Sequence, residues 1–173
     1  MNLTWANIVI DELCALGCEL FAIAPGSRST PLVVAAAKHP RAQTIICHDE
    51  RSLGFFALGY AGATGKLAAV IVTSGTAVAN LFPAVVEASM ESLPLVVLSA
   101  DRPAELRGTT ANQTIDQVKI FGNYARSFVD LPAPSKEAAL DKIAFQVRQA
   151  GLRALGPLPG PIQINCQYRE PLL

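Results

Sequence analysis

The chain has 173 residues, which is the size of one domain with room for a substantial core. Hydrophobic residues make up 51% of it and charged residues only 16%, which excludes a disordered chain and a coiled coil. Fourteen Lys and Arg residues balance fourteen Asp and Glu residues, and this zero net charge argues against a general nucleic-acid or anionic-membrane surface. The low charge and positive mean hydropathy predict apolar surface that a partner covers.

Cysteine usage and the N-terminal sequence indicate the compartment. Four cysteines form no CxxC pair, and a chain of this length needs no disulfide scaffold, so we expect thiols and a cytoplasmic location. Residues 1–5 carry no basic stretch and no continuous apolar run, so no signal peptide is expected. The longest apolar stretch, 67–86, is interrupted by polar residues and Pro83, which indicates strand, turn and helix instead of a membrane span.

Helical and strand patterns alternate along the chain. The predicted helices cover residues 2–16, 32–38, 49–64, 77–88 and 135–154, with a short helix near 116–121. The predicted strands cover residues 19–24, 43–47, 67–72, 95–98, 125–129 and 160–165. Thr4 and Ser135 are expected to cap the first and last helices, and Gly17 and Gly65 to end the first and third. The apolar face expected for the last helix consists of Leu140, Ile143, Val147 and Leu152.

This order of elements predicts an α/β fold. Continuous apolar strands separated by helices are typical of a parallel sheet that is covered on both faces. We therefore expect a three-layer α/β/α sandwich with a mostly parallel six-stranded sheet, forming a single domain over residues 1–173. Ligands of such sheets bind at the carboxyl ends of the strands. The loops expected there, 25–31, 47–51, 73–76 and 99–113, are unusually polar for so apolar a chain.

The first of these loops, Pro25 to Pro31, contains Ser27 and Arg28. A Gly-Ser turn before a helix offers N–H groups and hydroxyls to an anion, and an arginine adds a planar fork suited to carboxylate or phosphate. A capped helix beside a solvated arginine explains the same residues. The GxxxxGK[ST] pattern is absent, which excludes a P-loop.

The second loop places Glu50 at the end of a strand, where a helix begins. The residue is either a glutamate favoured by the helix dipole or a carboxylate directed into a cleft. His48 and Asp49 precede it, but no second cluster has the spacing of metal ligands, so no metal site is predicted in this chain.

The third and fourth loops add hydroxyl, amide and guanidinium groups. Thr73, Ser74, Gly75 and Thr76, followed by Asn80, can cap a helix or hold a ligand, and the glycine permits close backbone approach. In the fourth loop, two arginines and two amides suit an acidic, hydroxylated ligand, although solvated loop residues explain them equally. These residues are Arg102, Arg107, Asn112 and Gln113.

Six segments together resemble one enzyme family over almost the whole chain. They read PGSRSTP, HDERSLGFFALGYAGATGK, AAVIVTSGTAVANLFPAVVEA, LSADRP, ANQT and GPIQINCQYREPL. In this order they resemble 2-succinyl-5-enolpyruvyl-6-hydroxy-3-cyclohexene-1-carboxylate synthase, a thiamine-diphosphate enzyme of menaquinone or phylloquinone biosynthesis. HDERS and TSGT are shared across thiamine-diphosphate enzymes, whereas PGSRSTP, SADRP and ANQT are more specific to the synthase. The resemblance implies the pyrimidine-binding domain of the thiamine-diphosphate-binding fold.

The resemblance also implies roles for single residues. Glu50 matches the catalytic glutamate that hydrogen-bonds N1′ of the cofactor's aminopyrimidine, and Gln113 matches an amide beside the bound intermediate. The residues that match the pyrimidine-packing positions are Glu50, Thr73, Ser74, Gly75, Thr76 and Asn80. The residues that match substrate-binding positions are Ser27, Arg28, Arg102 and Gln113. The implied reaction is decarboxylation of 2-oxoglutarate and addition of the succinyl carbanion to isochorismate.

Only the first of the family's three domains is matched. The central and diphosphate-binding domains, the second of which holds Mg²⁺ or Mn²⁺ and the diphosphate, have no counterpart in these 173 residues. The resemblance therefore implies a transferase that is active as a longer chain, in a homodimer or tetramer formed through the domain interface, with this part inactive alone.

Three other interpretations remain open from the sequence. The chain fits the pyrimidine-domain subunit of another, split thiamine-diphosphate decarboxylase, which explains its length but not its substrate-loop motifs. It also fits a non-catalytic phosphosugar- or nucleotide-binding module, in which Glu50 has no obvious function, or a purely structural dimerisation domain, which replacement of Glu50 by Gln would distinguish from a catalytic one.

Overall fold

A parallel sheet forms the centre of the computed structural model, which describes residues 1–136 and 139–173. The strands are β1 (Leu20–Ile23), β2 (Gln43–Ile46), β3 (Ala68–Val72), β4 (Leu95–Asp101), β5 (Ser127–Leu131) and β6 (Pro161–Gln167). They pair in the order β2-β1-β3-β4-β6-β5, and every pair is parallel. β1, β3, β4 and β6 are buried along their whole length because they lie inside the sheet, whereas β2 is an exposed edge strand.

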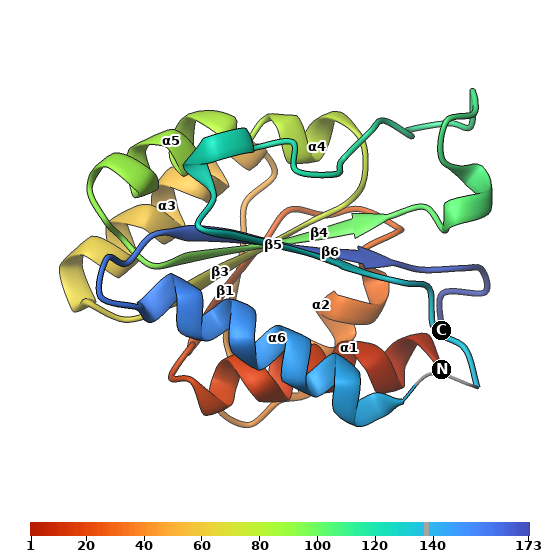
Figure 1. Cartoon of the computed structure of the whole chain (residues 1–173), viewed down its shortest axis with the longest axis horizontal. Coiled ribbons are helices and arrows are strands. Elements are labelled where there is room, and N and C mark those ends of the chain that lie inside the picture. Colours follow the sequence, from red (N-terminus) through yellow and green to blue (C-terminus); the bar gives the residue numbers. More distant parts are fainter. Residues whose placement is uncertain (137–138) are drawn as a thin grey trace.

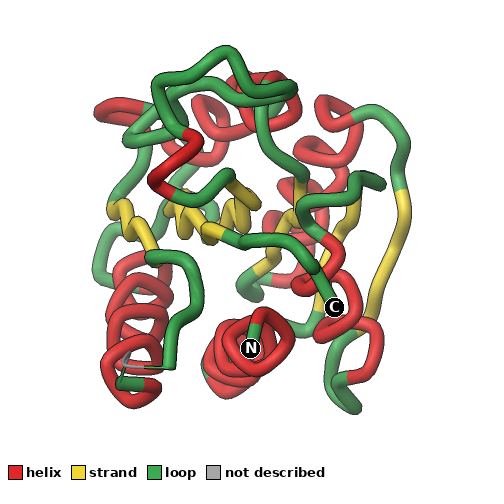
Figure 2. Tube along the Cα trace, turned by 90° about the vertical axis from the view of Figure 1, so that its right-hand side faces the viewer, coloured by secondary structure: helices red, strands yellow, loops and turns green. Residues whose placement is uncertain are grey.

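Helices cover both faces of this sheet (Figure 1). They are α1 (Asn2–Ala15), α2 (Thr30–Lys38), α3 (Glu50–Thr64), α4 (Thr76–Ala79), α5 (Phe82–Met90) and α6 (Leu140–Leu155), with 3₁₀ turns η1 (Ala104–Leu106) and η2 (Gly122–Tyr124). α1, α2 and α6 pack on one face, and α3, α4 and α5 on the other, each with its own apolar core. Figure 2 shows the same layers from the side. The predicted α/β/α sandwich with a six-stranded parallel sheet is therefore confirmed.

The prediction of one continuous helix over residues 77–88 is wrong, because this segment forms two helices. α4 ends at Ala79 and α5 begins at Phe82, with Asn80 and Leu81 between them. Pro83 has no N–H to donate to the carbonyl of Ala79, so the helical ladder cannot continue, and proline instead occupies the first turn of α5. The interruption leaves Asn80 at the end of α4, facing the loop after β2.

The last helix starts later than predicted and uses smaller residues to pack. α6 begins at Leu140 with Ala139 at its N-cap, so Ser135 is not the cap, and positions 137–138 of the predicted helix lie outside the described residues. Ile143 and Val147 are buried as predicted, whereas Leu140 and Leu152 are exposed. The buried face is completed by Ala150, Gly151 and Ala154.

The close approach of α6 to α1 at Gly151 leaves room only for small residues there. A Cβ on Gly151 would lie 2.3 Å from Leu16 Cδ1, so the missing side chain permits the close packing of α6 against α1. α1 itself begins at Asn2, which places Thr4 in its first turn and not at the predicted cap.

The segment between β4 and β5 also differs from the prediction. β4 extends to Asp101, and β5 begins at Ser127, two residues after the predicted start. The expected helix near 116–121 is a series of turns, because Asp116 Oδ1 accepts a hydrogen bond from the Val118 N–H and Lys119 has φ of 53°. No helix within 1–136 or 139–173 is long and apolar enough to span a membrane.

Candidate functional site

The four polar loops meet at one edge of the sheet. β1, β2, β3 and β4 run in the same direction, so the loops that follow them emerge together at their carboxyl ends. The sequence predicted this edge from the order of the elements, and the structure shows which side chains contact one another there.

Glu50 is the first residue of α3 and lies half-buried at the end of β2. Its Oε2 accepts a hydrogen bond of 3.0 Å from Asn80 Nδ2, which joins the loop after β2 to the end of α4. Among the described residues, no donor reaches its other oxygen, Oε1. Glu50 is therefore oriented through one carboxylate oxygen, while the other is left without a partner among the described residues.

Asp49 fixes the start of α3 and so the position of Glu50. Its carboxylate accepts hydrogen bonds from the N–H groups of Arg51, at 2.9 Å, and Ser52, at 3.3 Å, as an N-cap. The Arg51 side chain also pairs with it at 2.7 Å. The Arg51 guanidinium first, and then these backbone bonds, lower the pKa of Asp49 to about 2.

The loops after β1 and β3 touch at Gly26 and Thr73. A Cβ on Gly26 would lie 2.3 Å from Thr73 Cβ, so no side chain fits at position 26. Thr73 is itself buried, and Gly26 O accepts a hydrogen bond of 2.9 Å from Ser29 Oγ. This contact holds the PGSRSTP loop against the end of β3, while the side chain of Ser27 stays exposed.

A second contact joins the loops after β3 and β4. Ser74 Oγ donates to the carbonyl oxygen of Gln113 at 3.1 Å, and the Gly75 N–H donates to Gln117 Oε1 at 2.8 Å. Gly75 has φ of 82°, and a Cβ there would lie 2.9 Å from Gln113 Cγ. Glycine is required at position 75 by both its conformation and its neighbour. Thr76, the next residue, is exposed.

Two arginines lie at this edge. Arg102 donates to Ser74 Oγ through Nη1 and to the Asn112 carbonyl oxygen through Nη2, at 2.8 Å for the latter. Burial, followed by the positive charge of Arg28, lowers the pKa of Arg102. Two neighbouring cations that repel each other form a site that suits an anion.

Arg28 is held by the C-terminal segment. Its Nη1 donates to the Tyr168 carbonyl oxygen and its Nη2 to Glu170 Oε1, both at 3.0 Å. The side chain is 9% exposed, and its Nε has no hydrogen-bond partner among the described residues. Arg28 is thus a buried, oriented guanidinium, so the solvated arginine considered from the sequence is wrong.

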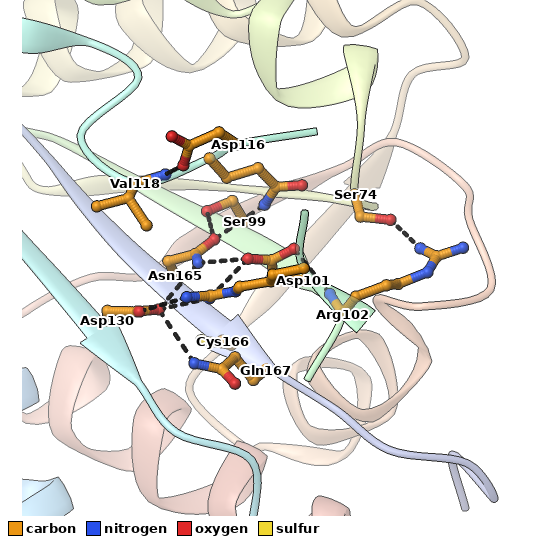
Figure 3. Close-up of polar contacts among 12 residues, drawn as sticks. Ser74, Ser99, Asp101, Arg102, Asp116, Val118, Asp130, Asn165, Cys166 and Gln167 are labelled. Carbon is orange, nitrogen blue, oxygen red and sulfur yellow. Dashed lines mark hydrogen bonds and ion pairs between the residues drawn. The ribbon is translucent and has the colours of Figure 1, made fainter. Parts of the chain in front are cut away.

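A buried polar network lies behind these loops (Figure 3). Arg107 bridges Asp101 Oδ2, at 2.7 Å, and Asp130, at 2.7 and 2.8 Å. Asn165 Nδ2 donates to Asp101 Oδ2 at 2.8 Å and to Asp130 Oδ1 at 3.0 Å. Burial raises the pKa of Asp101. Burial opposes ionisation of Asp130 as well, but hydrogen bonds from Arg107 and Asn165 outweigh it and lower the pKa of Asp130.

Sequence reasoning missed this network. It placed Arg107 in a ligand-binding loop, whereas the side chain forms buried ion pairs, and it gave no role to Gln117, Asp130 or Asn165. A signal was present, since Gln163, Asn165 and Gln167 interrupt a strand that is buried along its whole length. Polar residues at such positions need buried partners.

The groups that this edge leaves for a ligand are one carboxylate oxygen of Glu50 and the close turn at Gly75, which packs directly against Gln113. Within residues 1–136 and 139–173, no group of three or more His, Cys, Asp or Glu side chains is arranged to hold a metal ion.

Comparison with known proteins assigns the chain to a family. Residues 3–120 match the family described as thiamine pyrophosphate enzyme, N-terminal TPP binding domain. The chain belongs to this thiamine pyrophosphate enzyme family. Its edge loops are therefore those of an N-terminal TPP-binding domain.

Individual relatives are similar over nearly all of the chain. A 2-succinyl-5-enolpyruvyl-6-hydroxy-3-cyclohexene-1-carboxylate synthase from Chlorobium limicola is 57% identical over 96% of this chain and 29% of its own length. The synthase of that name from Rubrobacter xylanophilus is 51% identical over 99% of this chain and 30% of its own. Protein PHYLLO, chloroplastic, from Arabidopsis thaliana is 48% identical over 99% of this chain and 10% of its own. The chain thus spans less than a third of the length of these relatives.

Proposed function

We propose that this chain is the N-terminal, pyrimidine-binding domain of a thiamine-diphosphate-dependent 2-succinyl-5-enolpyruvyl-6-hydroxy-3-cyclohexene-1-carboxylate synthase. The observation that carries the proposal is the oriented Glu50 carboxylate in a chain that is 57% identical to a synthase of that name. The reaction joins a succinyl unit from decarboxylated 2-oxoglutarate to isochorismate, as a step of menaquinone or phylloquinone biosynthesis. The four cysteine thiols suit a cytoplasmic location.

Glu50 acts on the cofactor's aminopyrimidine in this proposal. Thiamine diphosphate supplies, when bound, the electron sink that stabilises the carbanion left by decarboxylation. Glu50 Oε1 would accept or share a proton with the pyrimidine of the bound cofactor, and the Asn80 bond to Oε2 would hold the carboxylate in place for this. Thr73, Ser74, Gly75 and Thr76 form the turn that would hold the ring.

The two arginines recognise the substrates' carboxylates. Arg28 and Arg102 lie close enough for the charge of one to lower the pKa of the other, so a dicarboxylate relieves their repulsion. Ser27 and Gln113 complete this substrate site in the proposal. The exposed Ser27 side chain and the Gln113 backbone, which has φ of 55°, both lie on the polar loops.

The remaining parts of the site belong to other domains. We propose that a central domain and a diphosphate-binding domain, with Mg²⁺ or Mn²⁺, complete the enzyme, in a homodimer or tetramer. Phe55 and Phe56, 47% and 44% exposed on the helix that begins with Glu50, suit such a domain interface.

A direct assay tests the proposal. The synthase that contains this chain is mixed with 2-oxoglutarate, isochorismate, thiamine diphosphate and Mg²⁺, and the succinyl product is followed by mass spectrometry. We expect product from the complete protein and none from residues 1–173 alone. Carbon dioxide release without an isochorismate adduct would instead indicate another thiamine-diphosphate decarboxylase. Product from residues 1–173 alone would contradict the proposed division of the site.

A further inference from the structure

The Gln117 side chain lies at the centre of the buried contacts behind the site. It is 1% exposed, and every polar atom of its amide is bonded. Oε1 accepts from the Gly75 N–H at 2.8 Å, while Nε2 donates to the Ala100 carbonyl oxygen at 3.1 Å and to Asn165 Oδ1 at 2.9 Å. Gln117 therefore connects the turn after β3 to the ends of β4 and β6.

The orientation of Asn165 is decided by two carboxylates. Asp101 Oδ2 and Asp130 Oδ1 accept hydrogen bonds, so Asn165 must direct its Nδ2 toward them. Its Oδ1 then points the other way and accepts from Ser99 Oγ at 2.8 Å and from Gln117 Nε2. A flipped Asn165 amide would place oxygen against two carboxylates and N–H groups against two donors.

The orientation of the Asn165 amide constrains the Gln117 amide, which contacts Gly75. Because Asn165 Oδ1 needs a donor, Gln117 must present Nε2 to it, and Gln117 Oε1 is left facing the Gly75 N–H. The Ala100 carbonyl oxygen also requires Nε2, so the carboxylate pair, acting through Asn165, and this backbone acceptor together determine that Oε1 meets Gly75. We call this series, from Asp101 and Asp130 through Asn165 and Gln117 to Gly75, the amide relay.

Stability alone does not explain the amide relay. Burying Asp101, Asn165 and Gln117 costs desolvation, and apolar residues of similar size commonly stabilise a core as well or better. What the relay supplies is a fixed orientation of the turn after β3. In this turn Ser74 Oγ donates to the Gln113 carbonyl oxygen and accepts a hydrogen bond from Arg102. These three residues and Gly75 belong to the proposed cofactor and substrate sites, whereas Asp101, Asp130, Asn165 and Gln117 belong to neither.

We propose that Asn165 and Gln117 are positioning residues, which hold the Gly75 turn against the Gln113 loop so that Gln113 and Arg102, both bonded to Ser74 of that turn, meet the substrate together. The kinetic consequence rests on the proposed synthase function. The structural consequence, an ordered and protected Gly75 N–H, does not depend on it.

Amide exchange tests the structural consequence in the complete protein. Gln117→Met removes the acceptor but keeps the shape, and we expect the peptide that carries Gly75 to exchange hydrogen for deuterium at least about tenfold faster. Asn165→Leu, which removes one of the two acceptors of Gln117 Nε2, should change exchange in the same direction. Gln117→Glu retains an oxygen opposite the Gly75 N–H, and in mildly acidic buffer, where its buried carboxyl is protonated, it should restore protection.

Kinetics tests the consequence for the site. A displacement of about 1 Å at a binding loop costs up to about 100-fold in rate, so we expect kcat/KM for isochorismate to fall at least about tenfold in Gln117→Met and to recover in Gln117→Glu. Arg126→Met is the matched control. It removes a half-buried side chain that bonds Ser89 at 2.9 and 2.8 Å at the opposite end of the strands. Its kcat/KM should stay within about twofold of the parent at a temperature where all variants are folded.

The outcomes separate the relay from the proposed function. Unchanged exchange at the Gly75 peptide in Gln117→Met, or faster exchange with kcat/KM within about twofold of an active parent, overturns the proposal. The proposal is also overturned if kcat/KM falls equally in Gln117→Met and Arg126→Met when their melting temperatures fall equally, since activity would then only follow stability. A parent without synthase activity refutes the proposed function, and the exchange measurement then decides the relay by itself.

Discussion

Glu50 and Asn80 meet across the site, with the Asn80 amide donating to the Glu50 carboxylate at 3.0 Å. The contact exists because Pro83 divides one predicted helix into α4 and α5, which leaves Asn80 at the end of α4. The helix interruption thus helps to orient the carboxylate on which the proposed chemistry depends.

Glu50→Gln should abolish most activity of the complete synthase without unfolding it. The amide cannot exchange a proton with the pyrimidine, so we expect kcat to fall at least about 100-fold, the typical contribution of a general acid–base group. Steady-state kinetics and the melting temperature measure the two effects. Glu91→Gln, at the exposed end of α5, is the control and should leave both unchanged. An active Glu50→Gln enzyme would remove Glu50 from the mechanism.

Dicarboxylates should stabilise the protein through Arg28 and Arg102. An anion between the two guanidinium groups relieves the repulsion that contributes to the lowered pKa of Arg102. Adding succinate should therefore raise the melting temperature more than adding chloride at equal ionic strength. Arg28→Gln should remove most of that difference, whereas Arg153→Gln, at the far helix α6, should retain it. Equal shifts in both variants would show that succinate acts nonspecifically.

Gly26→Ala should destabilise the fold because the loops after β1 and β3 are in direct contact. The new methyl group would lie 2.3 Å from Thr73 Cβ, and relieving such a clash typically costs about 1–3 kcal/mol. Gly59→Ala is the opposite case, since nothing lies within 4 Å of a Cβ there and alanine favours helix α3. Denaturant unfolding should show a loss for the first variant and a small gain for the second. If Gly26→Ala left the free energy of unfolding unchanged, the loops after β1 and β3 would be able to separate freely.

Acid should weaken the start of α3 through Asp49. Its pKa is lowered to about 2 in the folded protein, first by the Arg51 side chain, so its contribution is complete above the unfolded value of 3.8 and is lost as the pH falls through about 2. Asp49→Asn keeps a capping oxygen without the charge. The parent should therefore lose more stability than this variant between pH 4 and pH 2, as measured by thermal unfolding. Parallel pH profiles would exclude Asp49 as a source of acid sensitivity.

Thiol labelling should separate Cys47 from the other three cysteines. Burial raises the pKa of Cys14 to about 11 and that of Cys166 to about 12, and Cys18 is shifted in the same direction. Thiolate is the reactive form, so iodoacetamide should modify half-buried Cys47 first and the others only on unfolding. Peptide mass spectrometry measures the order. Rapid labelling of Cys166 in folded protein would show that β6 opens locally.

Local patterns were enough to predict the layers and the edge of the sheet that carries the site. Apolar runs of strand length in β1, β3 and β4, separated by helical patterns, lead to a parallel sheet, and parallel strands bring their carboxyl ends together. The start of α3 at Glu50 and its end at Gly65 also follow from local capping rules. Those predictions are confirmed because they depend on neighbours in the chain.

Contacts between distant segments were decided only by the tertiary structure. The sequence places Arg28 and Arg107 in polar loops, but their burial depends on Glu170, Asp101 and Asp130, which reach them from other elements. Gln117 and Asn165 are 48 positions apart, and no periodicity relates them. Hydrophobic spacing reports which face of an element is buried, whereas the partner of a buried polar group depends on how the strands are ordered. The sequence by itself thus determined the sheet and the edge where its polar loops meet, and the folded chain determined which groups there contact one another.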